Sequence, residues 1–215
     1  MSYTLAGIRN RILVDKLDDE DFDTQVLDNF INDAQRDIFS EFELPFTEKI
    51  FTGNLPQGAY IFQFPEDVSH LQSIVISSPD GKAVDIKDKF MDFQTFNGRF
   101  PSPVTSEVGS VMNWTLYGGK IITSRPIDLE YNMTIYYNKV PKTLLADTDV
   151  PELPAEYEEL LVLGAFYRVQ YREGDSDEGL LTKSEFRTKM EQMANRYGFR
   201  IGGGPIRMKN RQVGR

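Results

Sequence analysis

The stretch from Asp128 to Asp175, DLEYNMTIYYNKVPKTLLADTDVPELPAEYEELLVLGAFYRVQYREGD, contains a change of hydrophobic period that indicates the fold. Its first part alternates apolar with polar residues, which is typical of a half-buried β-strand. The apolar positions of this alternation are Leu129, Tyr131, Met133, Ile135 and Tyr137. An acidic linker marked by prolines follows, and from about Pro154 the apolar residues recur at helical spacing. We therefore predict that a β module ends here and that a helix follows it.

The N-terminal part of the chain shows the opposite change. A helical pattern from about Asp23 to Phe42 gives way at Leu44 and Pro45 to short alternating segments. A β module whose ends lie close together interrupts a helical connection without disturbing either core. We therefore predict an α+β fold, a helical bundle built from both termini with an inserted antiparallel β-sandwich or barrel domain. The predicted parts are a discontinuous bundle over 1–45 and 151–198, a β domain over 46–150, and an extended basic tail over 199–215.

The apolar spacing predicts helices over about 4–14 and 23–42, from Pro154 onward, and over about 177–197. In the second helix, an apolar row at four-residue spacing follows an acidic run, which makes Asp23 a candidate N-cap. This row consists of Phe22, Val26, Phe30, Ala34, Ile38 and Phe42, and it is widened by Leu27 and Ile31. In the third helix, the small residues Gly164 and Ala165 mark a point where another helix approaches closely.

Two turn sequences in the central part predict β-hairpins. Pro79-Asp80-Gly81 lies between apolar segments 74–76 and 83–86, and Gly118-Gly119 lies between segments 114–117 and 120–123. Residues 90–109 follow neither the helical nor the strand period. We interpret this segment as a long loop.

Composition excludes several classes of protein. The chain has 215 residues and a hydrophobic fraction of 40%, enough for one or two packed cores. It has no cysteine, which excludes disulfide bonds, zinc–thiolate sites and thiol nucleophiles. Neither a signal-peptide pattern nor an apolar run long enough for a membrane span is found. We therefore expect a soluble protein that is used inside a cell or in a particle assembled there.

The charge is unevenly distributed. The formal net charge of -9 disfavours binding of the body of the molecule to nucleic acid, because such binding requires cations that neutralise phosphates. Beyond Glu191 the sequence contains no further acid, and basic residues accumulate around a glycine triplet. The basic positions in the C-terminal tail are Arg200, Arg207, Lys209, Arg211 and Arg215.

Catalytic and metal-binding motifs are weak or absent. The single histidine, His70, precedes an apolar segment and has no partner motif. The acidic run 18–23 fails as a calcium loop, because Thr24 and Phe30 occupy the positions that require Gly and Glu. The glycine pairs and triplets lack the spacing of a phosphate-binding loop. We therefore expect neither an enzyme nor a bound metal or cofactor.

Aromatic residues are concentrated near the predicted loop. They are Phe90, Phe93, Phe96, Phe100 and Trp114. Aromatic side chains at this density belong either to a core or to an interaction surface. The sequence leaves both interpretations open, and Phe93, Phe96 and Phe100 are our candidates for an interaction loop.

Three segments together carry a family resemblance. They are FINDAQRDIF in the second helix, YNMTIYYNKVP followed by DTDVPELPAEYEELLVLGAFYRVQYREGD, and the last helix with its basic tail. In this layout the chain resembles the adaptor proteins of tailed bacteriophages, also called head-to-tail connector or head-completion proteins. The resemblance implies a virion protein of the neck, assembled in the host cytoplasm, that forms a ring of about twelve copies below the portal protein.

The resemblance also implies roles for particular residues. The tail, with Arg200, Arg207, Lys209, Arg211 and Arg215, would dock on the portal. Loops of the β insertion, with Phe93, Phe96 and Phe100, would face a downstream tail or nozzle protein or a neighbouring subunit. Leu27 and Ile31 would contact a neighbouring subunit. The ring would conduct double-stranded DNA during genome ejection.

Other functions remain open at this stage. The β domain is alternatively a carbohydrate- or protein-binding module of a phage tail or baseplate. The basic tail alternatively binds nucleic acid, and scattered carboxylates leave an enzyme as the last alternative.

Overall fold

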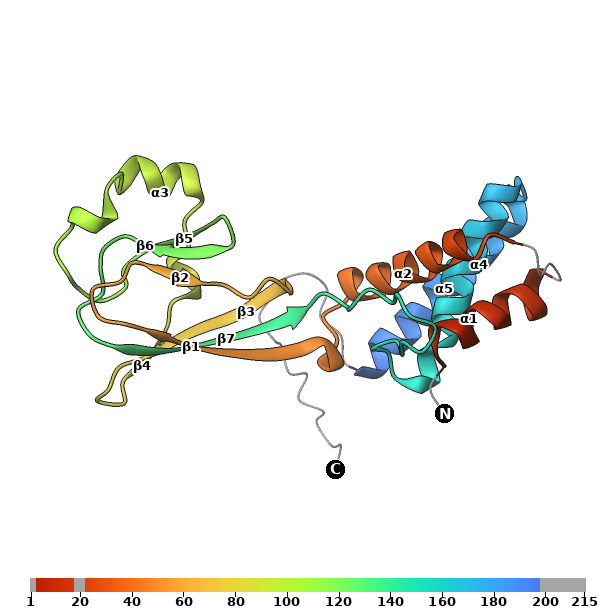
Figure 1. Ribbon diagram of the computed structural model, residues 1–215, viewed down its shortest axis with the longest axis horizontal. Helices are drawn as coiled ribbons and strands as arrows, with labels where there is room; N and C mark the ends of the chain where they lie inside the picture. The colour runs from red at the N-terminus through yellow and green to blue at the C-terminus, as the bar shows by residue number, and fades with distance from the viewer. Residues whose placement is uncertain (1–2, 18–21, 198–215) are drawn as a thin grey trace, which may run out of the picture. The chain divides into compact units, whose positions relative to one another are not determined.

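The computed structural model describes residues 3–17 and 22–197, and it confirms the predicted α+β fold class (Figure 1). The chain divides into two compact units. The helical unit comprises Met1–Thr47 and Val140–Arg215, and the β unit comprises Glu48–Lys139. Each unit has its own hydrophobic cluster.

The helical unit contains four long helices. They are α1 (Leu5–Ile12), α2 (Thr24–Glu41), α4 (Glu159–Glu173) and α5 (Ser176–Tyr197). A π-helical turn, Leu13–Leu17, extends α1, and short 3-10 turns lie at Pro45–Thr47 and Ala155–Tyr157. The Asp23 carboxylate accepts hydrogen bonds from the amides of Gln25 at 3.0 Å and Val26 at 3.3 Å. The predicted N-cap of the second helix is therefore confirmed.

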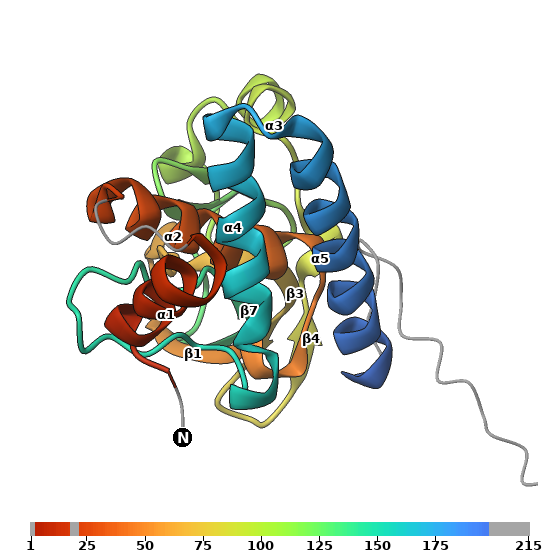
Figure 2. The same ribbon diagram turned by 90° about the vertical axis from the view of Figure 1, so that its right-hand side faces the viewer.

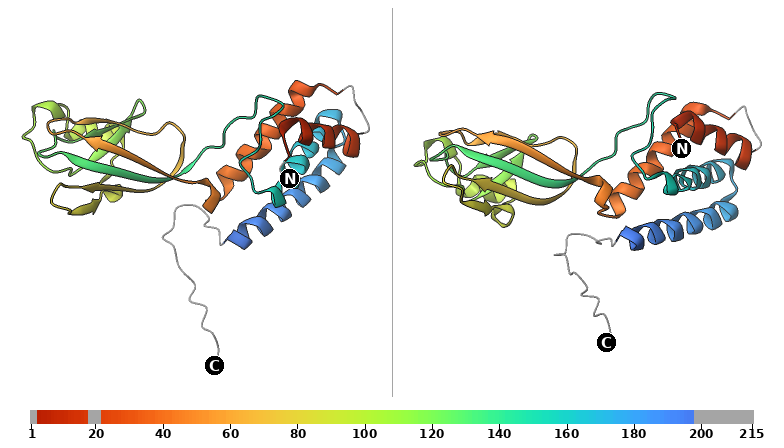
Figure 3. Two further views of the ribbon diagram at one scale, coloured as in Figure 1. Left: turned by 60° about the horizontal axis from the view of Figure 1, so that its bottom comes forward. Right: turned by 90° about the horizontal axis from the view of Figure 1, so that it is seen from below.

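Helix α4 is the centre of this unit. Most of its residues from Leu160 to Gln170 are buried. Helices α1 and α2 pack on it, as does α5, and α5 lies on the opposite side of α4 from α1 (Figures 2 and 3). A Cβ atom added at Gly164 would lie 2.5 Å from Ala34 Cβ in α2 and 3.0 Å from the Phe186 ring in α5. The close approach predicted at the small residues of α4 is therefore confirmed.

The buried face of α2 differs from the predicted one in its first half. Leu27 and Ile31 are fully buried in the helical unit, where they share one cluster with α1 and α4. Phe22 and Phe30, which belong to the predicted main row, are only partly buried. Ala34 and Ile38 of that row are fully buried, so the buried face of α2 combines the second half of the predicted row with Leu27 and Ile31. Leu27 and Ile31 are therefore core residues, and the prediction that they face another subunit is wrong.

The β unit contains two antiparallel sheets. Its strands are β1 (Glu48–Leu55), β2 (Ile61–Gln63), β3 (Val68–Ser77), β4 (Ala83–Asp85), β5 (Trp114–Tyr117), β6 (Lys120–Thr123) and β7 (Tyr131–Lys139). One sheet has the order β1-β7-β3-β4 and the other the order β2-β6-β5. Side chains of both sheets share one hydrophobic cluster. The closed form, sandwich or barrel, stays a prediction.

Both predicted hairpins are confirmed. In the β3–β4 hairpin, Ser77 is opposite Ala83. In the β5–β6 hairpin, Tyr117 is opposite Lys120, and the two-residue turn has φ values of 59° at Gly118 and 71° at Gly119. Two positive φ angles are those of a turn whose twist matches the flanking strands, and glycine adopts them without steric cost.

The predicted loop over 90–109 contains a helix. It is α3 (Phe93–Arg99), with short 3-10 turns at Lys87–Lys89 and Pro103–Thr105. The Asp92 carboxylate caps α3 by accepting a hydrogen bond from the Thr95 amide at 3.0 Å, and Phe96 is the buried residue of the helix. Seven residues with one buried side chain present no recognisable period, which is why the pattern indicated a loop.

The segment 140–150, which we assigned to the β domain, belongs to the helical unit. The Asn32 side chain donates a hydrogen bond to the Leu144 carbonyl at 3.0 Å and accepts one from the Leu144 amide at 2.8 Å. The Leu5 amide at the start of α1 donates to the Asp149 carbonyl at 2.8 Å. These bonds join residues that are distant in sequence, so no local pattern reports them.

The close packing at Gly164 generates a prediction. Gly164→Ala should lower the free energy of unfolding, because overpacking costs about 1–3 kcal/mol and exceeds the ~1 kcal/mol that alanine gains in a helix. Gly7→Ala in α1 is the matched control, since the added Cβ would lie 3.5 Å from its nearest neighbour, Thr4 Oγ1. The control should be neutral or stabilising. Urea denaturation followed by far-ultraviolet circular dichroism measures both, and equal stability of the two variants would contradict the packing described.

Candidate interaction surfaces

The described residues contain no group of three or more His, Cys, Asp or Glu side chains placed to hold a metal ion. Within the same part of the chain, no helix has the length and hydropathy needed to cross a membrane. The features with functional potential are therefore surfaces. Two lie on the β unit and two on the helical unit.

The first surface is an aromatic cluster on the β unit. Trp114 at the start of β5 is buried, and its Nε1 donates a hydrogen bond to the Ile86 carbonyl at 2.7 Å. Phe90 lies against Trp114 edge to face, with the ring centroids 5.0 Å apart, and remains 51% exposed. Phe93 stacks on Tyr117 at a centroid distance of 4.1 Å. The cluster therefore presents fixed aromatic side chains to solvent along an edge strand.

The three aromatic candidates from the sequence have different positions. Phe93 is exposed, Phe96 is buried, and Phe100 packs on Phe96 with the ring centroids 5.3 Å apart. Phe96 is therefore unavailable to a partner, and its prediction as an interface residue is wrong. Leu116 and Tyr117 are exposed in β5 and were not among the predicted interface residues. They are the last two residues of the WTLY segment, whose first two residues are buried.

Next to this cluster is a hollow of about 400 Å³. Its lining is Phe64, Val68, Ser69, Leu71, Lys87, Phe90, Trp114 and Leu116. A sugar ring requires several convergent polar groups, and this lining offers only one hydroxyl and one ammonium. The hollow is therefore suited to an apolar side chain of a protein partner.

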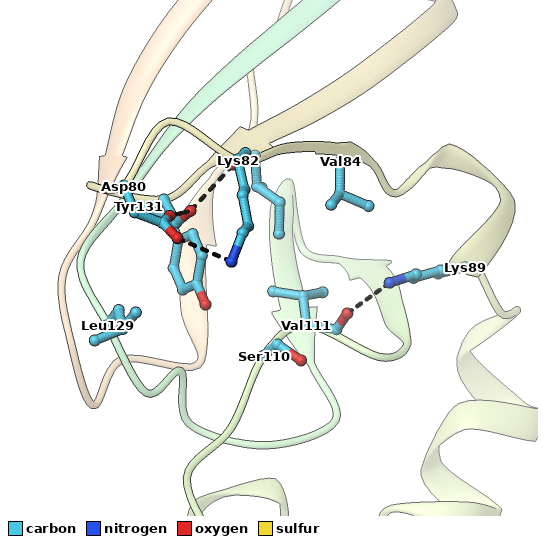
Figure 4. A pocket seen from close by; sticks show the side chains of 10 residues that line it. Asp80, Lys82, Val84, Lys89, Ser110, Val111, Leu129 and Tyr131 are labelled. Carbon is cyan, nitrogen blue, oxygen red and sulfur yellow. Dashed lines mark hydrogen bonds and ion pairs between the residues drawn. The ribbon is translucent and has the colours of Figure 1, made fainter.

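The second surface is a hollow of about 280 Å³ that lies beside the β3–β4 hairpin of the β unit (Figure 4). Several of its polar side chains are paired within the protein. Lys82 lies 3.1 Å from the Asp80 carboxylate, the Lys89 ammonium donates to a backbone carbonyl at 3.0 Å, and the Tyr131 hydroxyl donates to Asp128 at 2.8 Å. Burial, followed by the bond to Asp128, raises the pKa of Tyr131 above its ordinary value. These groups are satisfied internally, so we assign them to the stability of the hairpin.

The third surface is a turn in the helical unit, residues 142–149, which we call the pinned turn. The Asp149 carboxylate accepts hydrogen bonds from the amides of Leu145 at 2.8 Å and Ala146 at 2.9 Å. The Lys142 ammonium lies 3.3 Å from the same carboxylate. Leu144 is buried, whereas the adjacent Leu145 is 82% exposed. The turn therefore displays a leucine side chain on a backbone whose amides are already bonded.

The fourth surface is the outer face of α5. Leu180 and Leu181 near its N-terminus are 58% and 73% exposed. A shallow hollow of about 420 Å³ follows, lined by Leu180, Lys183, Ser184, Arg187, Thr188 and Glu191. These leucines were not among the predicted interface residues, because the apolar period of α5 indicates only which side of the helix is buried.

The remaining candidates from the sequence are His70 and the basic residues of the tail. His70 in β3 lies beside the Ser69 hydroxyl, with its Nδ1 3.1 Å from the Ser69 oxygen. The tail candidates Arg200, Arg207, Lys209, Arg211 and Arg215 lie outside the described residues.

The chain matches a known protein family. The family described as SU10 adaptor protein matches residues 3–209. The match covers both the helical and the β unit. No curated protein matches the chain in a sequence search.

The pinned turn generates a prediction about pH. The Ala146 and Leu145 amides, with Lys142, lower the pKa of Asp149 below its ordinary value. The stabilisation is therefore complete above the ordinary carboxyl pKa of about 4 and is lost as the pH falls through the lower folded-state pKa. Asp149→Ala should accelerate hydrogen exchange of these two amides at neutral pH.

Asp149→Asn provides the matched control for the charge. Its amide oxygen still accepts the two hydrogen bonds, so the turn should stay protected, but the acid-induced loss of protection should be absent. Unchanged exchange in Asp149→Ala would show that the turn is held by other contacts.

Proposed function

The chain belongs to the SU10 adaptor protein family, and from this premise we propose that it is the structural head-to-tail adaptor of a tailed phage. As a phage adaptor it is a virion component that contacts other capsid or tail proteins. In the proposal, about twelve copies assemble in the host cytoplasm into a ring below the portal protein. The ring joins the portal to the next tail or nozzle protein in the neck and conducts DNA during genome ejection.

The family match over both units is the observation that carries this proposal. The surfaces of the chain support it, because both units expose apolar side chains on helices, on strands or on a hydrogen-bonded turn. Exposed apolar residues that are held in place are typical of protein–protein contact sites. No chemistry is required of such a protein.

The charge of the chain is consistent with DNA passage. A ring that conducts DNA must not retain it, and the formal net charge of -9 repels the phosphate backbone. The basic residues beyond Tyr197 are separate from this acidic body in sequence. We propose that they dock on the portal, with Arg207, Lys209 and Arg211 as the central contacts.

The aromatic cluster on the β unit is the proposed contact with the downstream protein. Phe93 and Leu116 are exposed beside an apolar hollow, which suits an apolar side chain of that protein. The alternative, a carbohydrate-binding module, has less support because the lining has few polar groups. A protein-binding module of the tail or baseplate would use the same surface.

Ring formation is the direct test of the proposal. The purified protein, mixed with the portal protein of its own phage, should give a ring on the portal in negative-stain electron microscopy. Phe93→Ser together with Leu116→Ser should leave this ring intact and abolish joining of the downstream protein. A protein that remains monomeric and unbound in the presence of portal would refute the adaptor function.

The basic tail gives a second test. Arg207→Glu, Lys209→Glu and Arg211→Glu in one variant should weaken portal binding and its dependence on salt, because charge complementarity is lost. The matched control carries the same charge change in the β unit, as Lys87→Glu, Arg99→Glu and Lys120→Glu. The control should bind the portal as the unmodified protein does. Equal binding of both variants, measured by sedimentation, would exclude the tail as the portal contact.

A further inference from the structure

The helical unit displays Leu145 in an unusual way. The side chain is 82% exposed, yet the turn that carries it is tied to two helices. Asn32 in α2 holds the neighbouring residue Leu144 by two hydrogen bonds, and the Ala6 amide of α1 donates to the Asp147 carbonyl at 3.2 Å. An exposed apolar side chain on such a backbone loses little conformational entropy when it enters a partner. An exposed apolar side chain that is held in this way is suited to burial against a partner.

The opposite side of the same unit offers a matching surface. The hollow on α5 is bordered by Leu180 and is wide enough for a leucine side chain. Within the described residues, Arg187 in this hollow has no carboxylate partner, and Lys183 lies over the Tyr167 ring at 5.7 Å from its centroid. Figures 2 and 3 agree that α5 and the 140–150 segment lie on opposite sides of α4.

The charges of the two surfaces are complementary. The α5 hollow contains two cations and one carboxylate, Glu191. The ion pairs around the pinned turn contain three carboxylates and two cations. Arg9 contacts both Asp28 and Asp147, at 2.7 and 3.1 Å, and Lys142 contacts Asp149. The α5 hollow therefore has an excess of positive charge, and the pinned turn has an excess of negative charge.

We propose that Leu145 of one copy of this chain enters the α5 hollow of the next copy. Two different, complementary surfaces on opposite sides of one unit generate a head-to-tail contact, which closes into a ring when the rotation between copies allows it. The inference rests on the proposed ring and names its subunit contact. Arg187 lies opposite the carboxylates of the pinned turn, and Leu180 contacts Leu145.

Thiol cross-linking tests the contact directly, because the chain has no cysteine of its own. Ala146→Cys and Ser184→Cys are combined in one chain, which leaves all the leucines in place. A short bismaleimide, added to the protein with purified portal rings, should give a ladder of covalent dimers, trimers and larger species. The matched control combines Ala146→Cys with Ser40→Cys, an exposed position on α2, and should give no ladder.

Three results would overturn the contact. The first is a ladder of equal strength in the control. The second is cross-linked dimers from Ala146→Cys alone, which would indicate a symmetric contact between two pinned turns. The third is rings on the portal, seen by electron microscopy, without a ladder. In this third case the adaptor function stands and the contact is wrong, whereas the absence of rings from the unmodified protein refutes both.

A second variant measures the anchor itself. Leu145→Ser should raise the protein concentration at half-maximal ring formation at least about tenfold, because the leucine side chain no longer buries its apolar surface in the contact. Leu129→Ser is the matched control, since Leu129 is exposed in the β unit and outside the proposed contact. Its half-maximal concentration should be unchanged. Equal values for both variants would exclude Leu145 as the anchor.

Discussion

The helical unit depends on the close approach of three helices at Gly164. At this position α4 lacks a side chain, so Ala34 of α2 and Phe186 of α5 pack directly against its backbone. Helices from the two halves of the chain thereby share one core. The β unit is inserted into the chain without disrupting this core, because its first and last strands are paired, with Glu48 opposite Asn138. Both ends of the insertion therefore lie together.

The segment 140–150, which leads from the β unit back to the helices, has two roles. The amides of Leu5 and Ala6 at the start of α1 donate to the Asp149 and Asp147 carbonyls, so the segment satisfies groups that a helix N-terminus leaves open. Bonds to Asn32 and the Asp149 carboxylate fix the same segment. A connection that is ordered for structural reasons thus also displays an exposed side chain. This combination suits an adaptor protein, whose function is contact with other proteins.

The β unit was predicted well where its signals are local. Alternation located β7, and glycines located the two hairpins, because period and turn conformation depend on neighbouring residues. The aromatic residues were predicted as a group and not individually. Phe93 and Phe96 are three residues apart in one short helix, yet one is exposed and the other buried. Which side of α3 faces the sheets is decided by the sheets.

The sequence by itself determined the α+β class, the helices and hairpins, and the family, because these follow from period, turn residues and a pattern that spans both units. Only the tertiary structure decided that Leu27 and Ile31 are core residues, that 140–150 belongs with the helices, and that Leu145 is exposed. Burial depends on which elements pack together. The local sequence pattern around a leucine can be the same in a core as on a surface. Whether the leucine is buried is decided by partners that lie far away in the sequence, as the bond between Asn32 and Leu144, more than one hundred residues apart, illustrates.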